Sequence, residues 1–178
     1  WLEFKVALQR INDILSAKRE QSQGFAICPT IKGSIKFDNV SFKYDAQSSD
    51  HIIKNVDLEI LPGQKVAFVG RSGSGKSTLI NMVNRILSPT SGRILIDDID
   101  ISTLDVMSLR RQIGVVEQSP FVFSGTVREN ITITNPSIPY EAVVSAATLS
   151  GVHEFATNLP MRYDTKIGEG GRALSGGQ

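Results

Sequence analysis

The sequence predicts an α/β fold with a mixed sheet, in which an antiparallel flank and a parallel core are followed by a helical subdomain. Two stretches with alternating apolar side chains, within 35–44 and 52–61, predict the antiparallel flank. An apolar run, a glycine-rich loop and a helical pattern then follow in direct succession, which is the order found around parallel strands buried on both faces. Helical spacing after residue 140 predicts the subdomain.

Length and composition are those of an ordinary globular domain with a short appendage. The chain has 178 residues, of which 40% are hydrophobic, and its net charge of +1 gives no bulk reason to expect nucleic acid or an anionic membrane as a partner. Its single cysteine, Cys28, excludes an internal disulfide or a cysteine metal cluster. No apolar run approaches the roughly 20 residues that cross a bilayer.

Residues 1–20 are expected to form an amphipathic helix, followed by a polar linker over 21–32. Apolar residues recur at alternating three- and four-residue steps at Trp1, Phe4, Leu8, Ile11 and Leu15. Two interpretations remain open: the helix packs on its own domain, or it is a connector that descends from a membrane domain encoded before Trp1. We expect the compact domain to begin near Gly33.

The first strand, 35–44, changes phase near Asp38, which indicates a β-bulge. The second, 52–61, ends at Pro62-Gly63, so the two strands are expected to pair in antiparallel fashion. Further along, the pattern predicts a strand at 65–69, a helix at 77–87, strands at 93–97 and 113–116, and a helix at 141–149.

The glycine-rich loop between the 65–69 strand and the 77–87 helix reads Gly-Arg-Ser-Gly-Ser-Gly-Lys-Ser over residues 70–77. This fits G-x-x-x-x-G-K-[ST], the Walker A pattern. Its glycines allow backbone N–H groups to turn toward phosphate oxygens, its lysine reaches the β and γ phosphates, and its hydroxyl binds Mg²⁺. The helix that follows directs its free N–H groups and the positive end of its dipole to the same place.

A second motif, Leu-Ser-Gly-Gly-Gln at 174–178, is the signature peptide of a single family. Together the two motifs make the sequence resemble the nucleotide-binding domain of ABC (ATP-binding cassette) proteins, from Gly33 to Gln178. This resemblance implies a P-loop NTPase core over 33–120 and a helical subdomain over 121–178, with ATP and Mg²⁺ as ligands.

The resemblance also assigns roles within the loop. Lys76 is expected to act in catalysis, Ser77 to bind Mg²⁺, and Thr78 to approach the α phosphate. Tyr44 matches the aromatic residue that stacks on adenine; because stacking reads no base edge, it does not by itself separate ATP from GTP. The remaining ligands expected in the loop are Gly70, Ser72, Gly73, Ser74 and Gly75.

Gln118 follows the predicted 113–116 strand and resembles the glutamine that contacts Mg²⁺ or the attacking water in this family. The segment behind it, Phe-Ser-Gly-Thr-Val-Arg-Glu-Asn at 123–130, is similar to that of the exporters, which carry a membrane domain. Gln118 is therefore expected to serve in catalysis, in nucleotide binding and as a ligand of Mg²⁺.

The resemblance implies that the signature peptide closes over a nucleotide held by a second nucleotide-binding domain. The residues expected to act in this way are Ser175, Gly176, Gly177 and Gln178. Glu169 is expected to face a transmembrane domain, which places the chain at the cytoplasmic face of a membrane. The dimer can be a homodimer or a heterodimer, and nucleic acid is not expected as a partner.

In this family the signature is followed by a strand ending in Asp-Glu and by a histidine. We therefore expect the chain to be a C-terminally truncated fragment that does not hydrolyse ATP alone, because phosphoryl transfer depends on positioned charges. Two alternatives remain: a soluble ABC ATPase that acts on nucleic acid or the ribosome, and a nucleotide-binding module without turnover. His51, His153 and the carboxylates at 97–105 suggest no metal site.

Overall fold

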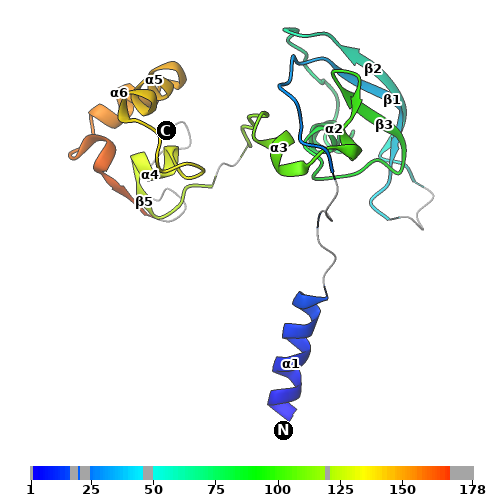
Figure 1. Ribbon diagram of the computed structural model, residues 1–178, viewed down its shortest axis with the longest axis horizontal. Coiled ribbons are helices and arrows are strands. Elements are labelled where there is room, and N and C mark those ends of the chain that lie inside the picture. The colour runs from blue at the N-terminus through cyan, green and yellow to red at the C-terminus, as the bar shows by residue number, and fades with distance from the viewer. Residues whose placement is uncertain (1, 17–19, 21–24, 46–49, 119–120, 169–178) are drawn as a thin grey trace. The chain divides into compact units, whose positions relative to one another are not determined.

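The computed structural model describes residues 2–16, 20, 25–45, 50–118 and 121–168. They belong to two compact units, Trp1–Val115 and Val116–Gln178, and each unit is described by itself (Figure 1). Among the described residues, every helix is too short or too polar to span a bilayer. The division into 1–20, 21–32, 33–120 and 121–178 stays a prediction.

The first unit begins with helix α1, Leu2–Leu15, which is shorter than the helix predicted over residues 1–20. The described side chains of its predicted stripe, Phe4, Leu8, Ile11 and Leu15, are exposed, from 49% for Leu8 to 79% for Leu15. The described part of the chain therefore leaves this stripe uncovered.

The main sheet of the first unit is antiparallel throughout, in the order β2-β1-β3-β4 (Figure 1). Its strands are β1 (Ile35–Phe42), β2 (Ile53–Ile60), β3 (Ser91–Ile96) and β4 (Ile99–Asp100). The predicted antiparallel pair is confirmed. Alternating side chains of β1 and β3 reach one core, where Phe37 and Ile94 are each 1% exposed and pack with Met82 of helix α2 (Lys76–Val83).

The predicted bulge lies at Asn39, because the register of β1 shifts between Phe37 and Val40 against β2 and between Asp38 and Ser41 against β3. Asn39 has φ 49°, and Gly92 of β3 has φ 79° beside it. A Cβ at Gly92 would lie 2.2 Å from the carbonyl oxygen of Asn39, so only glycine fits. The absence of a side chain at Gly92 therefore leaves room for the bulged backbone at Asn39.

Helix α2, Lys76–Val83, ends four residues before the predicted 77–87 helix does. Its C-cap is Asn84, and Arg85 with φ 54° leaves the helical region.

The strand predictions at 65–69 and 113–116 are wrong, because neither segment is part of a sheet ladder in the described chain. Val69 and Val116 are 93% and 97% exposed. An apolar run forms a parallel strand only when neighbouring strands accept and donate its backbone hydrogen bonds and helices cover both faces of the sheet.

Part of the segment predicted as a linker packs on the core. Ala26 forms a parallel bridge with Leu104, and Cys28 is buried, with its N–H donating to Ser108 Oγ at 2.9 Å. Burial, followed by the negative charge of Asp97, raises the pKa of the Cys28 thiol. The polar composition of the linker gave no signal of this contact, because the bonds are made by its backbone.

The carboxylates of Asp97, Asp100 and Asp105 accept hydrogen bonds from backbone N–H groups. Asp97 accepts hydrogen bonds from the N–H groups of Lys32, Gly33 and Ser34 and from Ser34 Oγ. Asp100 caps the 3₁₀ turn η1 (Ile101–Thr103), and Asp105 caps helix α3 (Val106–Arg110). These carboxylates therefore join the segment before β1 to the end of β3 and start the two short helical elements.

The second unit contains strands β5 (Gly125–Thr126) and β6 (Lys166–Ile167), helices α4 (Val127–Ile131), α5 (Tyr140–Ser150) and α6 (Val152–Thr157), and the 3₁₀ turn η2 (Arg162–Asp164). The helix predicted at 141–149 corresponds to α5. Thr126 and Glu129 form a capping box at α4. Tyr163 is 2% exposed and its hydroxyl lies 2.9 Å from His153 Nδ1, so this histidine has a structural partner.

We expect the bonds of Asp97 to produce an acid-dependent loss of stability. Partial burial alone would raise the pKa of Asp97, but the hydrogen bonds from 32–34 outweigh burial, and the pKa lies below its ordinary value of 3.8. A depressed folded-state pKa adds stability above the unfolded-state value, and this is lost as pH falls below about 4. Asp97→Asn should lower the free energy of unfolding by about 1–3 kcal/mol at pH 7.

The difference between wild type and Asp97→Asn should shrink as the pH falls through this range, in urea titrations followed by circular dichroism. Asp98→Asn is the matched control, since Asp98 is the exposed neighbour and also has a positive φ, 65°. Equal effects of the two substitutions at pH 7 would contradict this account of Asp97.

Candidate functional site: a phosphate-binding loop at the start of a helix

The loop of residues 70–77, here called the phosphate loop, ends in the first turn of α2. Thr78, Leu79 and Met82 form the buried face of this helix and fix it against the sheet. Gly75 is its N-cap, and the first intrahelical hydrogen bond runs from Leu79 N–H to the Gly75 carbonyl at 3.0 Å. The N–H groups ahead of Leu79 have no partner within a helix that starts here.

Two glycines of the phosphate loop have positive φ, 79° at Gly73 and 88° at Gly75. Gly75 also has no room for a side chain, because a Cβ would lie 2.4 Å from Ile53 Cδ1 and 3.2 Å from the carbonyl oxygen of Ile52. A Cβ at Gly73 would have no neighbour within 4 Å. Gly75 is therefore required by both conformation and packing, and Gly73 by conformation alone.

The ammonium group of Lys76 lies inside the loop that precedes it. Lys76 Nζ donates to the carbonyl oxygens of Gly70 at 3.0 Å and Arg71 at 2.7 Å, and to Ser74 Oγ at 3.3 Å. The first turn of α2 contains no acidic residue. A lysine charge and the positive helix end thus meet without a compensating carboxylate in that turn, which makes this an anion-binding arrangement.

Hydroxyl groups follow Lys76 directly. Ser77 is exposed, whereas Thr78 is buried and its Oγ1 lies 3.3 Å from the hydroxyl of Tyr44. The Tyr44 ring is 68% exposed and packs edge-on against Phe42, with ring centroids 4.9 Å apart. The structure thus brings the predicted aromatic residue to the first turn of α2, with most of its ring uncovered.

The other predicted site residues are distributed differently. Gln118 is exposed and belongs to the second unit. Glu169 and the residues of the signature peptide, Ser175, Gly176, Gly177 and Gln178, lie outside the described residues. The roles predicted for all of them stay predictions.

The sequence did not predict that Ile52 and Ile53 pack against the phosphate loop at Gly75. Ile52 and Ile53 lie more than twenty positions before Gly75, yet their atoms set the space available there. Ile53 belongs to the alternating apolar residues of the predicted 52–61 strand, but only the fold shows which backbone it contacts. The sequence pattern therefore predicted the loop but not the packing of Ile52 and Ile53 against it.

The chain is similar in sequence to a protein family and to several known proteins. Residues 53–178 match the protein family described as ABC transporter. The cyclolysin secretion/processing ATP-binding protein CyaB of Bordetella pertussis is 47% identical over 181 residues, an alignment that covers 100% of this chain and 25% of that protein. The leukotoxin translocation ATP-binding protein LktB of Mannheimia haemolytica is 43% identical, with the same coverage.

A solved structure is also similar. It is described as a bacterial Atm1-family ABC exporter with ATP bound, and it superposes with a TM-score of 0.86 at 33% sequence identity. The match covers 97% of this chain and 30% of that one. This chain spans about a quarter of the length of the curated relatives it matches.

Gly75→Ala and Gly73→Ala should separate packing from conformation in the phosphate loop. A positive φ costs an alanine about 1–2 kcal/mol, so Gly73→Ala should weaken binding of MgATP by roughly tenfold. Gly75→Ala adds a clash with Ile52 and Ile53 and should weaken it by roughly a further tenfold or more. Isothermal titration calorimetry of the full-length protein measures both. Equal losses would show that the packing against β2 is unimportant.

Proposed function

This chain belongs to the ABC transporter family, and we propose that it is the ATP-binding and hydrolysing domain of an exporter. In this proposal two such domains close on ATP, and hydrolysis reopens them to move a substrate through an attached transmembrane domain. The two relatives described above are named for secretion and for translocation, which supports export over import.

The family and the solved structure confirm the predicted fold class, an α/β P-loop core with a helical subdomain. The antiparallel sheet β2-β1-β3-β4 is the flank of that core, and α2 with the phosphate loop is its binding element. ABC domains bind ATP, so ATP is the nucleotide that we assign to the loop.

The observation that carries the proposal is the position of Lys76 within the phosphate loop. Its ammonium donates to the carbonyl oxygens of Gly70 and Arg71 and would exchange these bonds for bonds to β and γ phosphate oxygens when nucleotide binds. Backbone N–H groups at the start of α2 would hold the same phosphates, and Thr78 would approach the α phosphate. Ser77 and Gln118 would hold Mg²⁺, which neutralises phosphate charge during transfer. Gly70, Ser72, Gly73, Ser74 and Gly75 complete the proposed set.

We assign the opposite side of the nucleotide to a partner domain. Ser175, Gly176, Gly177 and Gln178 would bind the γ phosphate held by the partner, in a homodimer or a heterodimer. Gln118 would serve catalysis with Lys76. The transmembrane domain would place the chain at the cytoplasmic face of a membrane. Because the net charge is only +1, we do not expect nucleic acid as a partner.

Lys76→Ala should reduce ATP turnover of the full-length protein by at least about 100-fold, because a charge that stabilises the transferred phosphoryl group is lost. Release of inorganic phosphate measures this. Lys36→Ala, which removes an exposed lysine of β1, is the control and should keep wild-type turnover. Unchanged turnover in Lys76→Ala would exclude the proposed role of the loop.

Tyr44→Ala should weaken ATP binding by roughly tenfold, within the 1–3 kcal/mol of a base stacked on an aromatic ring. Tyr44→Phe keeps the ring and loses only the contact with Thr78, so most of the affinity should remain. GTP affinity should change in parallel, because stacking does not read the base edge. A fluorescent nucleotide displaced by ATP or GTP measures each affinity. Equal losses for the phenylalanine and alanine variants would argue against stacking.

A further inference from the structure

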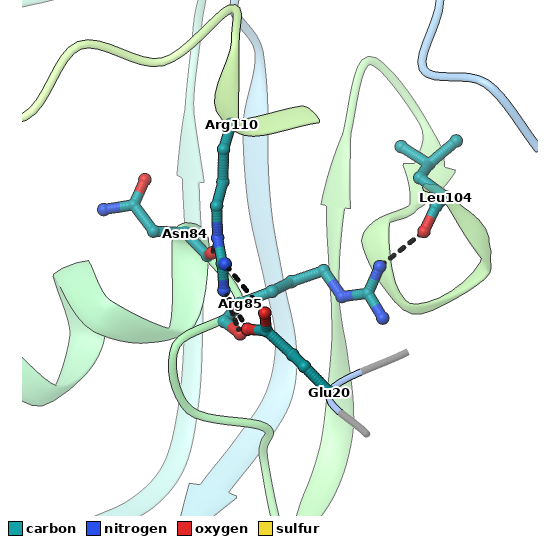
Figure 2. Close-up of polar contacts among 5 residues, drawn as sticks. All are labelled: Glu20, Asn84, Arg85, Leu104 and Arg110. Atoms are coloured by element: carbon teal, nitrogen blue, oxygen red, sulfur yellow. Dashed lines mark hydrogen bonds and ion pairs between the residues drawn. The ribbon is translucent and has the colours of Figure 1, made fainter. Parts of the chain in front are cut away.

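Arg110, the last residue of α3, lies against the C-terminal end of α2 (Figure 2). Its Nε donates to the carbonyl oxygen of Asn84 at 2.9 Å, and one of its terminal nitrogens donates to that of Arg85 at 3.0 Å. The last carbonyls of a helix have no donor within the helix, and a cation there meets the negative end of the helix dipole. Arg110 therefore caps the helix whose other end is the phosphate loop.

The same guanidinium group holds Glu20. Its two terminal nitrogens donate to the two carboxylate oxygens of Glu20, at 3.1 and 2.5 Å (Figure 2). The hydrogen bond from Arg110 lowers the pKa of Glu20, so the carboxylate is ionised at neutral pH. One planar arginine fork thus connects the end of α2 to the segment that follows α1, a geometry that a lysine cannot reproduce.

Phe25 and Ala26, further along the same segment, contact residues near the end of α2 and the start of α3. The Arg85 guanidinium carbon lies 5.6 Å from the centre of the Phe25 ring, and Arg85 also donates to the carbonyl oxygen of Leu104. Ala26 donates to the Thr103 carbonyl at 3.1 Å and accepts from Asp105 N–H at 2.6 Å. Residues 20 and 25–28 are therefore attached to the region where α2 ends and α3 begins.

The ion pair can open without dismantling the cap. The side chains of Arg110 and Glu20 are 29% and 55% exposed, so their attraction is partly screened by solvent. Arg110 would keep its bonds to Asn84 and Arg85 if Glu20 left. The side-chain oxygen of Asn84 is buried and has no partner among the described residues. A buried unsatisfied oxygen is costly, so this helix end is poorly satisfied in the arrangement observed.

We propose that the Glu20–Arg110 pair is a joint that couples the segment after α1 to nucleotide binding at the opposite end of α2, with both residues acting as positioning residues. Helix α2 has 8 residues and is rigid over its roughly 12 Å length, so a shift at the phosphate loop reaches Asn84 and Arg110. Linkage requires the effect to be reciprocal: if nucleotide binding tightens the joint, the joint tightens nucleotide binding by the same factor. The inference rests on the proposed function.

Glu20→Gln and Arg110→Lys in the full-length protein test the joint. Glutamine removes the charge of Glu20, and lysine keeps the charge of Arg110 but cannot bridge the two carbonyls and the carboxylate. Each variant should weaken MgATP binding about threefold or more, and the double variant should be no weaker than Arg110→Lys alone. Glu59→Gln, at an exposed glutamate of β2, is the control of equal charge and should bind like wild type.

Hydrogen exchange supplies a readout that a purely structural role would not change. Adding MgATP to the wild type should slow exchange of the amides of Ala26 and Cys28 by about threefold or more, together with those of the phosphate loop. In Arg110→Lys the phosphate loop should still be protected at saturating MgATP, while Ala26 and Cys28 should show no change.

The outcomes separate this inference from the proposed function. Protection of the phosphate loop without any change at Ala26 and Cys28 in the wild type would overturn the joint and leave the nucleotide site intact. Lower thermal stability of the variants with unchanged MgATP affinity would reduce Glu20 and Arg110 to structural residues and also overturn it. Absence of protection in the wild-type phosphate loop would overturn the proposed function, and the joint with it.

Discussion

The N–H groups at the start of α2 have no acceptor within the helix, and the surroundings of Gly75 keep them available. A side chain at Gly75 would displace Ile53, and a carboxylate in the first turn would compete for the donors, yet that turn contains none. The helix cannot slide away, because Leu79 and Met82 are held in the core between the sheet and α3. The exposure of these N–H groups is therefore a consequence of how α2 packs on the core.

Both ends of α2 meet charge of a defined sign. Lys76 adds positive charge where the dipole is positive, which is unfavourable until an anion arrives, and its hydrogen bonds to Gly70 and Arg71 offset part of this cost. Arg110 adds positive charge where the dipole is negative, which is favourable at once. The first turn has no carboxylate to offset its positive charge, whereas at the second end Arg110 donates to the carbonyl oxygens of Asn84 and Arg85.

The sequence predicted what depends on local pattern. The loop motif, the antiparallel strand pair with its bulge and helix α5 all follow from spacing within a few residues, and the structure contains them. The 65–69 and 113–116 runs were predicted wrongly as strands, because a strand requires a neighbour that its own residues do not specify. The contacts of Ile53 with Gly75 and of Glu20 with Arg110 join residues far apart in the chain, so no local pattern indicates them.

The burial of Cys28 makes the reactivity of its thiol a measure of local opening of the protein. It is the only cysteine in the sequence, and its sulfur lies within a core that Phe37 and Leu104 share. Burial disfavours the thiolate, which is the form that reacts with electrophiles, so labelling by a maleimide requires the surrounding segment to separate from the core. The rate of that single labelling reaction would report how often the segment around Cys28 separates from the core, without any engineered probe.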